Sequence, residues 1–114
     1  MGRLARFIQF LPGRRATWRV VDRVASGADV PVRLPPRGAV VVRAIDVDRF
    51  LAFDCPCTED HRLLLDLDTD HKPAWTVRVP SPLTIWPSID YRHEGKRCHF
   101  VIKHGEVRWV LNDD

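Results

Sequence analysis

Hydrophobic and polar residues alternate along much of the chain, which is typical of β-strands that bury one face. Residues 61–68, for example, place Leu63, Leu65 and Leu67 on one face. The same alternation, or a run of β-branched residues, predicts further strands at 17–24, 39–45, 49–55, 75–79, 83–86, 88–92, 97–103 and 106–111. Residues 3–11 have apolar residues at a helical spacing, but FIQF followed by Pro12-Gly13 also fits a short strand, which we prefer. We therefore predict an all-β, or strongly β-dominated, fold.

Proline and glycine separate the predicted strands. The Pro/Gly-rich residues 26–38 predict a loop, and the short segments at 93–95 and 104–105 predict hairpin turns. A chain of 114 residues is long enough to bury a core without help from disulfides or metals. We predict a single small domain over residues 1–114, built of short antiparallel strands and hairpins.

One predicted hairpin brings candidate catalytic residues together. With a tight turn at residues 93–94, Ser88 lies directly opposite His99, at a Cβ separation of ~5 Å. A serine hydroxyl needs such a neighbouring base to act as a nucleophile, and a third group usually orients that base. Asp90 is the candidate for the third group, with Arg97 as its competitor. The alternative is an ordinary solvated hairpin without chemistry.

Three cysteines and a histidine form a candidate metal site. Cys55, Cys57 and His61 lie close in sequence, and Cys98 would complete a four-ligand zinc set. The alternative is that Cys98 is a small core residue and that no metal binds. Cys98 precedes His99, but neighbours on a strand point to opposite faces, so the two do not form a catalytic pair.

Charge and hydropathy indicate which classes of partner the chain could bind. Residues 1–43 carry nine Arg and two Asp, a net charge of +7, whereas residues 44–114 carry a net charge of −4. Such a basic part can bind nucleic acid or an acidic protein; the alternative is a solvated basic face that pairs with the chain's own acidic half. The scattered arginines, without an aromatic stacking pattern, favour this alternative and make a nucleic-acid partner unlikely. No apolar run approaches the ~20 residues of a membrane span. The odd number of cysteines and the absence of a signal peptide favour the cytoplasm.

The second part of the chain resembles a bacterial family of uncharacterised domains. Members carry a CPCGCGHRLLLNL run followed in order by P.W, HPS, C.SHF.I and G.V.W. The matching segments in this chain are CPCTEDHRLLLDL (55–67), PAW (73–75), WPS (86–88), KRCHFVI (96–102) and GEVRW (105–109). Order and spacing agree over about half of the chain, within residues 44–114.

The resemblance implies a function. Such proteins are found beside bacterial ubiquitin-like conjugation genes, with E1-like and E2-like enzymes, and look like serine peptidases that trim the ubiquitin-like precursor or cleave its conjugates. Ser88 and His99 would then be nucleophile and base, and the ubiquitin-like protein or its conjugate would be the partner. The alternative is a non-catalytic β-domain that binds a partner protein in the same system.

Four departures from the family pattern bear on the candidate sites: Glu59, Lys96, Cys98, and Trp86, which replaces the histidine of HPS. Two of the four family cysteines, which look like a zinc set, are Glu59 and Lys96 in this chain. An ion pair between these two residues would replace the metal. Cys98 stands where the family has serine, so a thiol at that position is an alternative to Ser88 as the reactive group.

Overall fold

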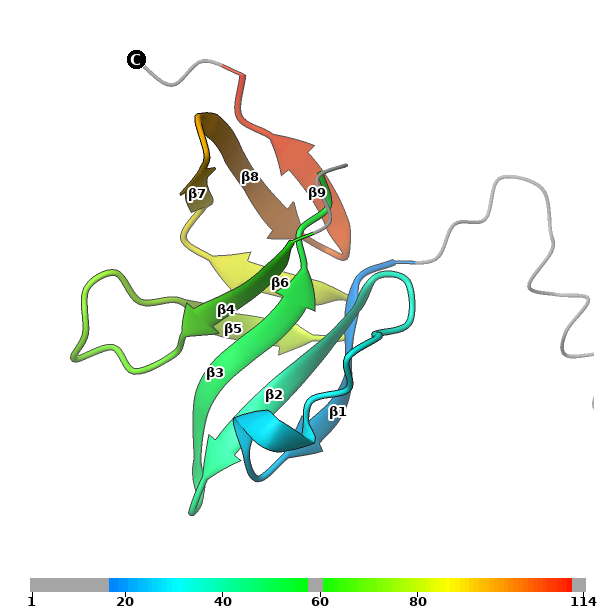
Figure 1. Ribbon diagram of the computed structural model, residues 1–114, viewed down its shortest axis with the longest axis vertical. Helices are drawn as coiled ribbons and strands as arrows, with labels where there is room; N and C mark the ends of the chain where they lie inside the picture. The colour runs from blue at the N-terminus through cyan, green and yellow to red at the C-terminus, as the bar shows by residue number, and fades with distance from the viewer. Residues whose placement is uncertain (1–16, 58–60, 112–114) are drawn as a thin grey trace, which may run out of the picture.

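The computed structural model describes residues 17–57 and 61–111 (Figure 1). Within these residues the chain forms one short 3-10 helix, η1 (Gly27–Asp29), and nine strands: β1 (Arg19–Val24), β2 (Gly38–Ala44), β3 (Val47–Asp54), β4 (Arg62–Asp66), β5 (Thr76–Pro80), β6 (Leu83–Trp86), β7 (Ile89–His93), β8 (Lys96–Lys103) and β9 (Glu106–Trp109). The all-β prediction is confirmed. The predicted strand at 3–11 lies outside the described residues. Nothing among the described residues forms a helix with the length and hydrophobicity needed to cross a bilayer.

The strands form three sheets with the orders β1-β2-β3-β4, β5-β6 and β7-β8-β9. Every paired neighbour is antiparallel except β1 and β2, which run parallel. Parallel neighbours need a crossover connection rather than a tight turn. The predicted Pro/Gly-rich loop provides this connection, since it carries the chain from the end of β1 back to the start of β2.

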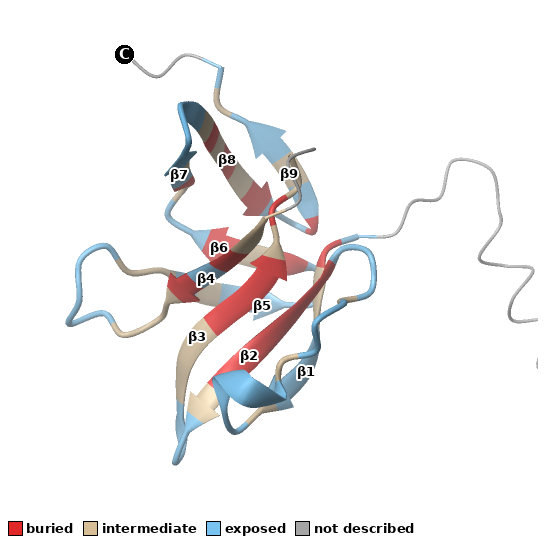
Figure 2. Ribbon diagram, viewed as in Figure 1, coloured by how far each residue is buried: buried red, intermediate tan, exposed pale blue. Residues whose placement is uncertain are grey.

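Alternating side chains of the three sheets pack into one shared core, visible as the buried segments in Figure 2. On β4, Leu63 and Leu65 are buried while Leu64 between them is 58% exposed, as the period of two predicts. The largest fully buried side chains are Phe53, Phe100, Leu51, Leu83, Ile89, Ile102, Val40 and Val41. Because β8 contributes its apolar face to this core, its polar face lies outside the core, where polar side chains can react or bind.

The β7–β8 hairpin turns at Glu94–Gly95, one residue later than the sequence analysis expected. Both turn residues have positive φ, +49° and +80°, which is the geometry of a two-residue hairpin turn. His93 therefore pairs with Lys96, and His99 lies opposite Asp90. The predicted direct pairing of Ser88 with His99 is wrong. The pairing is displaced by two positions, however, so each side chain keeps its predicted face.

Three backbone hydrogen bonds join the sheets in a closed ring. The Trp18 N–H donates to the Gly105 carbonyl (2.9 Å), the Gly105 N–H to the Leu83 carbonyl (2.8 Å), and the Leu83 N–H to the Trp18 carbonyl (2.8 Å). Gly105 has φ of +79°, and a Cβ atom added there would lie 2.5 Å from the Thr17 Cβ atom and 3.0 Å from that of Pro82. Only glycine fits this position.

We predict that Gly105→Ala lowers the free energy of unfolding by about 2–4 kcal/mol, because it combines an unfavourable positive φ with overpacking at the junction of the sheets. Gly95→Ala is the matched control, since Gly95 has the same backbone geometry (φ +80°) but nothing within 4 Å of an added Cβ atom. It should lose only about 1 kcal/mol. Urea unfolding of both variants measures the difference, and equal losses would contradict the role of the ring.

Candidate functional site

Ser88 and His99 lie together on the polar face of the β7–β8 hairpin. Ser88 directly precedes β7, and His99 lies in the middle of β8. The Ser88 Oγ atom is 3.3 Å from His99 Nε2, and both residues are half-buried. Ser88 reaches the ring diagonally, because the residue directly opposite His99 is Asp90. The structure therefore brings the two predicted residues into contact through a different register.

Neighbouring segments hold the backbone of both residues. The Trp75 indole N–H donates to the Ser88 carbonyl at 3.1 Å. The Val110 N–H, just beyond β9, donates to the His99 carbonyl at 2.9 Å. The sequence analysis did not identify Trp75 or Val110 as supporting residues. Trp75 is the tryptophan of the P.W motif, which was the available signal, whereas no local pattern marks Val110; each contact joins segments more than ten residues apart.

The carboxylate of Asp90 is engaged by Arg97. The Arg97 Nε and a terminal guanidinium nitrogen donate to the two Asp90 oxygens at 2.7 and 2.5 Å. This bidentate hydrogen bonding from Arg97 is the main cause that holds the pKa of Asp90 below its ordinary value. The His99 Nδ1 atom is buried and has no hydrogen-bond partner among the described residues. Arg97 thus takes the carboxylate that the sequence analysis proposed as the orienting group for His99.

The Ser88–His99 geometry suits nucleophilic chemistry. An unprotonated His99 Nε2 can accept a hydrogen bond from the Ser88 hydroxyl and then its proton, which makes the oxygen a better nucleophile. Cys98 does not share this face. Its side chain is buried, and its Sγ atom lies 3.7 Å from His61 Nε2 on the other side of β8. Of the two reactive groups considered, Ser88 is the one in contact with His99.

The predicted metal ligands converge into a second cluster. The ligand atoms of Cys55, Cys57, His61 and Cys98 all lie within 4.8 Å of one another. His61 Nε2 is 3.0 Å from Cys57 Sγ. The rings of Tyr91 and His93 pack beside the His61 ring, with centroid distances of 4.8 and 5.6 Å. This cluster could hold a metal ion.

The donor set of this cluster fits zinc. Three thiols and one imidazole are a ligand set of structural zinc sites, where ligand sulfurs bound at ~2.3 Å lie close together around one ion. Burial raises the pKa of the Cys55 thiol to about 12. A buried thiol of this kind stays protonated unless a cation displaces its proton. Glu59, the proposed ion-pair partner of Lys96, lies outside the described residues.

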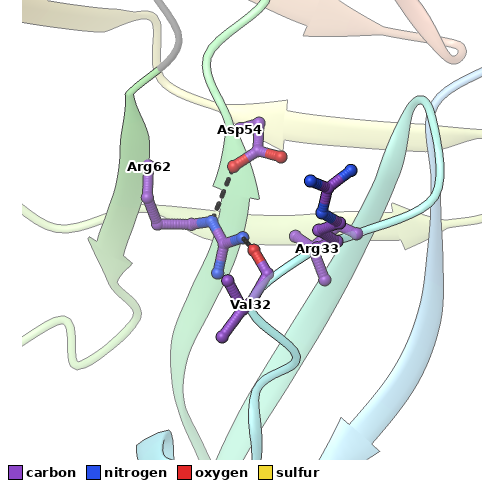
Figure 3. A pocket seen from close by; sticks show the side chains of 5 residues that line it. Val32, Arg33, Asp54 and Arg62 are labelled. Atoms are coloured by element: carbon purple, nitrogen blue, oxygen red, sulfur yellow. Dashed lines mark hydrogen bonds and ion pairs between the residues drawn. The ribbon is translucent and has the colours of Figure 1, made fainter.

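A pocket of about 640 Å³ lies between the loop before β2 and strands β3 and β4 (Figure 3). It is lined by Val32, Arg33, Leu34, Asp54 and Arg62. Arg62 Nε donates to the Asp54 carboxylate at 2.7 Å, and a terminal nitrogen of Arg62 donates to the Val32 carbonyl at 2.8 Å (Figure 3). These bonds attach the loop before β2 to the sheet. None of the predicted catalytic or metal-binding residues lines this pocket.

A comparison with models of protein families shows the family of the chain. The family model described as the bacterial ubiquitination-like system serine protease (BubE) matches residues 26–110. This match covers well over half of the sequence, so the chain belongs to that family, and the resemblance noted in the sequence is confirmed. A search of curated proteins found no match, and neither did a search of solved structures.

We predict that Arg97→Gln returns the pKa of Asp90 toward its ordinary value of about 3.9. Because the folded-state pKa is lowered, the ion pair stabilises the hairpin above the unfolded-state pKa. This stabilisation is lost as the pH falls through the folded-state pKa. NMR titration of the Asp90 carboxyl carbon measures the change. Arg108→Gln, on β9, is the control and should leave the titration as it is; an unshifted Asp90 in the Arg97 variant would contradict the assignment.

Proposed function

We propose that this chain, as a member of the family of bacterial ubiquitination-like system serine proteases, cleaves its substrates with Ser88 as nucleophile and His99 as general base. The observation that carries the proposal is the 3.3 Å separation of Ser88 Oγ from His99 Nε2. The substrate we propose is a bacterial ubiquitin-like protein, either as a precursor with a C-terminal extension or as a conjugate with another protein.

The proposed reaction follows from this pair. As the Ser88 oxygen attacks the scissile carbonyl carbon, His99 Nε2 takes up the hydroxyl proton. The resulting imidazolium then donates that proton to the leaving amine, which departs and leaves an acyl ester on Ser88. A water molecule, deprotonated by His99, hydrolyses the ester and releases the carboxylate product.

Asp90 has an electrostatic role in this proposal. It lies directly opposite His99, and the charge of His99 is among the causes that lower the Asp90 pKa. A carboxylate at this position favours the imidazolium that forms during the reaction. Because Arg97 occupies both Asp90 oxygens, we assign Asp90 to charge stabilisation rather than to a hydrogen bond with His99 Nδ1.

The second candidate function is a non-catalytic β-domain that binds a partner protein of the conjugation system. Two observations favour it: the His99 Nδ1 atom has no partner among the described residues, and Asp90 is held by Arg97. A binding domain needs neither a nucleophile nor a base. Covalent labelling of Ser88 separates the two functions.

We predict that a fluorophosphonate probe labels the wild-type protein at Ser88. The same protein should release the ubiquitin-like protein of its conjugation system from a C-terminal fusion. Ser88→Ala should abolish labelling, and both Ser88→Ala and His99→Gln should lower kcat/KM at least about 1,000-fold, because nucleophile and base act as a unit. Intact-mass spectrometry and a gel-based cleavage assay are the measurements.

Two further variants complete this test. Ser81→Ala, on the exposed connection between β5 and β6, is the matched control and should label and cleave like the wild type. Cys98→Ser asks whether the thiol contributes to labelling. Labelling that survives in Ser88→Ala would reject Ser88 as the nucleophile. Absence of labelling and cleavage in the wild type would favour the binding domain.

We propose that Cys55, Cys57, His61 and Cys98 hold a structural zinc ion. Four protein ligands leave no open position, so the ion would stabilise the fold rather than activate water. It would join the β3–β4 connection to β8, the strand that carries His99. The support for this proposal is the convergence of the four ligand atoms within 4.8 Å.

We predict that the purified protein contains about one zinc per chain. His61→Ala should lower the zinc content, and a chelator should lower the thermal unfolding midpoint of the wild type, because bound metal contributes to folding. Elemental analysis and calorimetry measure the two effects. His104→Asn, at the exposed position of the β8–β9 turn, is the matched control and should keep its zinc. A metal-free, chelator-insensitive wild type would contradict the site.

The remaining partners follow from the proposed pathway. E1-like and E2-like proteins of the same system are further candidate partners, because they present the ubiquitin-like protein in activated or conjugated form. We place the protein in the cytoplasm, where three free cysteines would remain reduced.

A further inference from the structure

The outer edge of β7 presents backbone groups that no strand formed by residues 17–57 and 61–111 pairs with. In a two-residue hairpin, the residue pair that closes the turn exchanges both of its hydrogen bonds, and every second pair thereafter does the same. On β7 these inward residues are His93, Tyr91 and Ile89. The N–H and C=O groups of Asp90 and Arg92 therefore point away from β8, along the outer edge.

This edge is regular. The pairing of β7 with β8 runs without a bulge, whereas the β1–β2, β2–β3 and β5–β6 ladders each contain a register shift. β7 also contains no proline, and both Asp90 and Arg92 are exposed. Edge strands are commonly blocked by prolines, bulges or covering segments. The edge of β7 has neither a proline nor a bulge, so its backbone can pair with a strand whose side chains accommodate the exposed charges of Asp90 and Arg92.

The edge begins at the proposed nucleophile. Ser88 is the residue before β7, and the Trp75 indole holds its carbonyl at 3.1 Å. A peptide paired with the outward groups of Asp90 and Arg92 would lie on the side of β7 away from β8 and end beside Ser88. Because the Ser88 hydroxyl points toward His99 on β8, the peptide would leave the edge there and cross over Ser88 to reach it. Backbone pairing of this kind gives affinity independently of side-chain identity.

We propose that the outer edge of β7 binds the C-terminal tail of the ubiquitin-like substrate as an added, extended strand. The inference rests on the proposed function of Ser88. In a conjugate, the group that leaves is a lysine side chain, which has no peptide backbone to pair next to the scissile bond. The tail of the ubiquitin-like protein is the part shared by precursor and conjugate, and it supplies a continuous backbone up to the scissile carbonyl.

The first test replaces the outward N–H of residue 92. Arg92→Pro removes this donor and places ring atoms at the edge, while the hydrogen bonds to β8 remain, since proline is tolerated on an edge with its nitrogen outward. Arg92→Ala removes the same charged side chain but keeps the N–H. We expect kcat/KM for the ubiquitin-like fusion to be at least about tenfold lower in Arg92→Pro than in Arg92→Ala. Equal values in two folded variants would overturn the proposal.

The second test leaves the edge unaltered. A synthetic peptide of the tail, N-methylated at one position at a time, is titrated against Ser88→Ala by fluorescence anisotropy. Strand addition predicts that N-methylation weakens binding at every second position, where the peptide N–H points to β7, and has little effect between them. Weakening without this alternation would overturn the proposal, even if Arg92→Pro fails to fold.

The two proposals fail separately. If the wild type cleaves the fusion but the N-methyl series shows no alternation, the strand addition is wrong and the peptidase assignment stands. If the series alternates but the wild type neither labels nor cleaves, the edge binds the tail and the catalytic role of Ser88 is wrong. A peptide of the C-terminal extension, which is the part released from the precursor, serves as the comparison. If N-methylation weakens its binding as much as it weakens binding of the tail peptide, the tail is not the specific occupant of the edge.

Discussion

The backbone hydrogen-bond ring of Trp18, Leu83 and Gly105 connects the three sheets. A two-stranded ribbon such as β5–β6 is at best marginally stable alone, and the buried residues of the three sheets form one shared core. The ring brings the start of β1, the start of β6 and the β8–β9 turn to one point, so that the apolar faces of all three sheets close over a common core. The absence of a side chain at Gly105 is what permits this approach.

β8 contributes residues to the common core and to both candidate sites. Its buried face contributes Phe100 and Ile102 to the core and Cys98 to the thiol cluster. Its polar face carries His99 toward Ser88. Because alternate residues of one strand serve the two sites, any shift of β8 against its neighbours would move His99 and Cys98 together. A zinc ion on Cys98 would therefore also restrain the proposed base.

The membership of the chain in a serine protease family and the contact of Ser88 with His99 support the same function by independent routes. What distinguishes the proposed site from a serine–histidine–aspartate triad is the third residue, because Arg97 holds the Asp90 carboxylate. The neighbouring edge of β7 adds a backbone surface at which an extended substrate can lie. In the proposed binding mode, this strand edge would hold the extended substrate beside Ser88.

The sequence by itself determined the strands and their faces, because the pleat alternates side chains locally and without reference to the rest of the molecule. That is why Ser88 and His99 were correctly assigned to one face and Cys98 to the other. The residue opposite His99 was not determined in this way, since an adjacent turn position satisfies the same alternation. Only the tertiary structure decided that the turn uses Glu94 and Gly95, that Arg97 takes Asp90, and that Cys98 meets the β3–β4 connection. These outcomes depend on turn geometry and on core packing between segments distant in sequence. A local hydrophobic pattern contains no information about either.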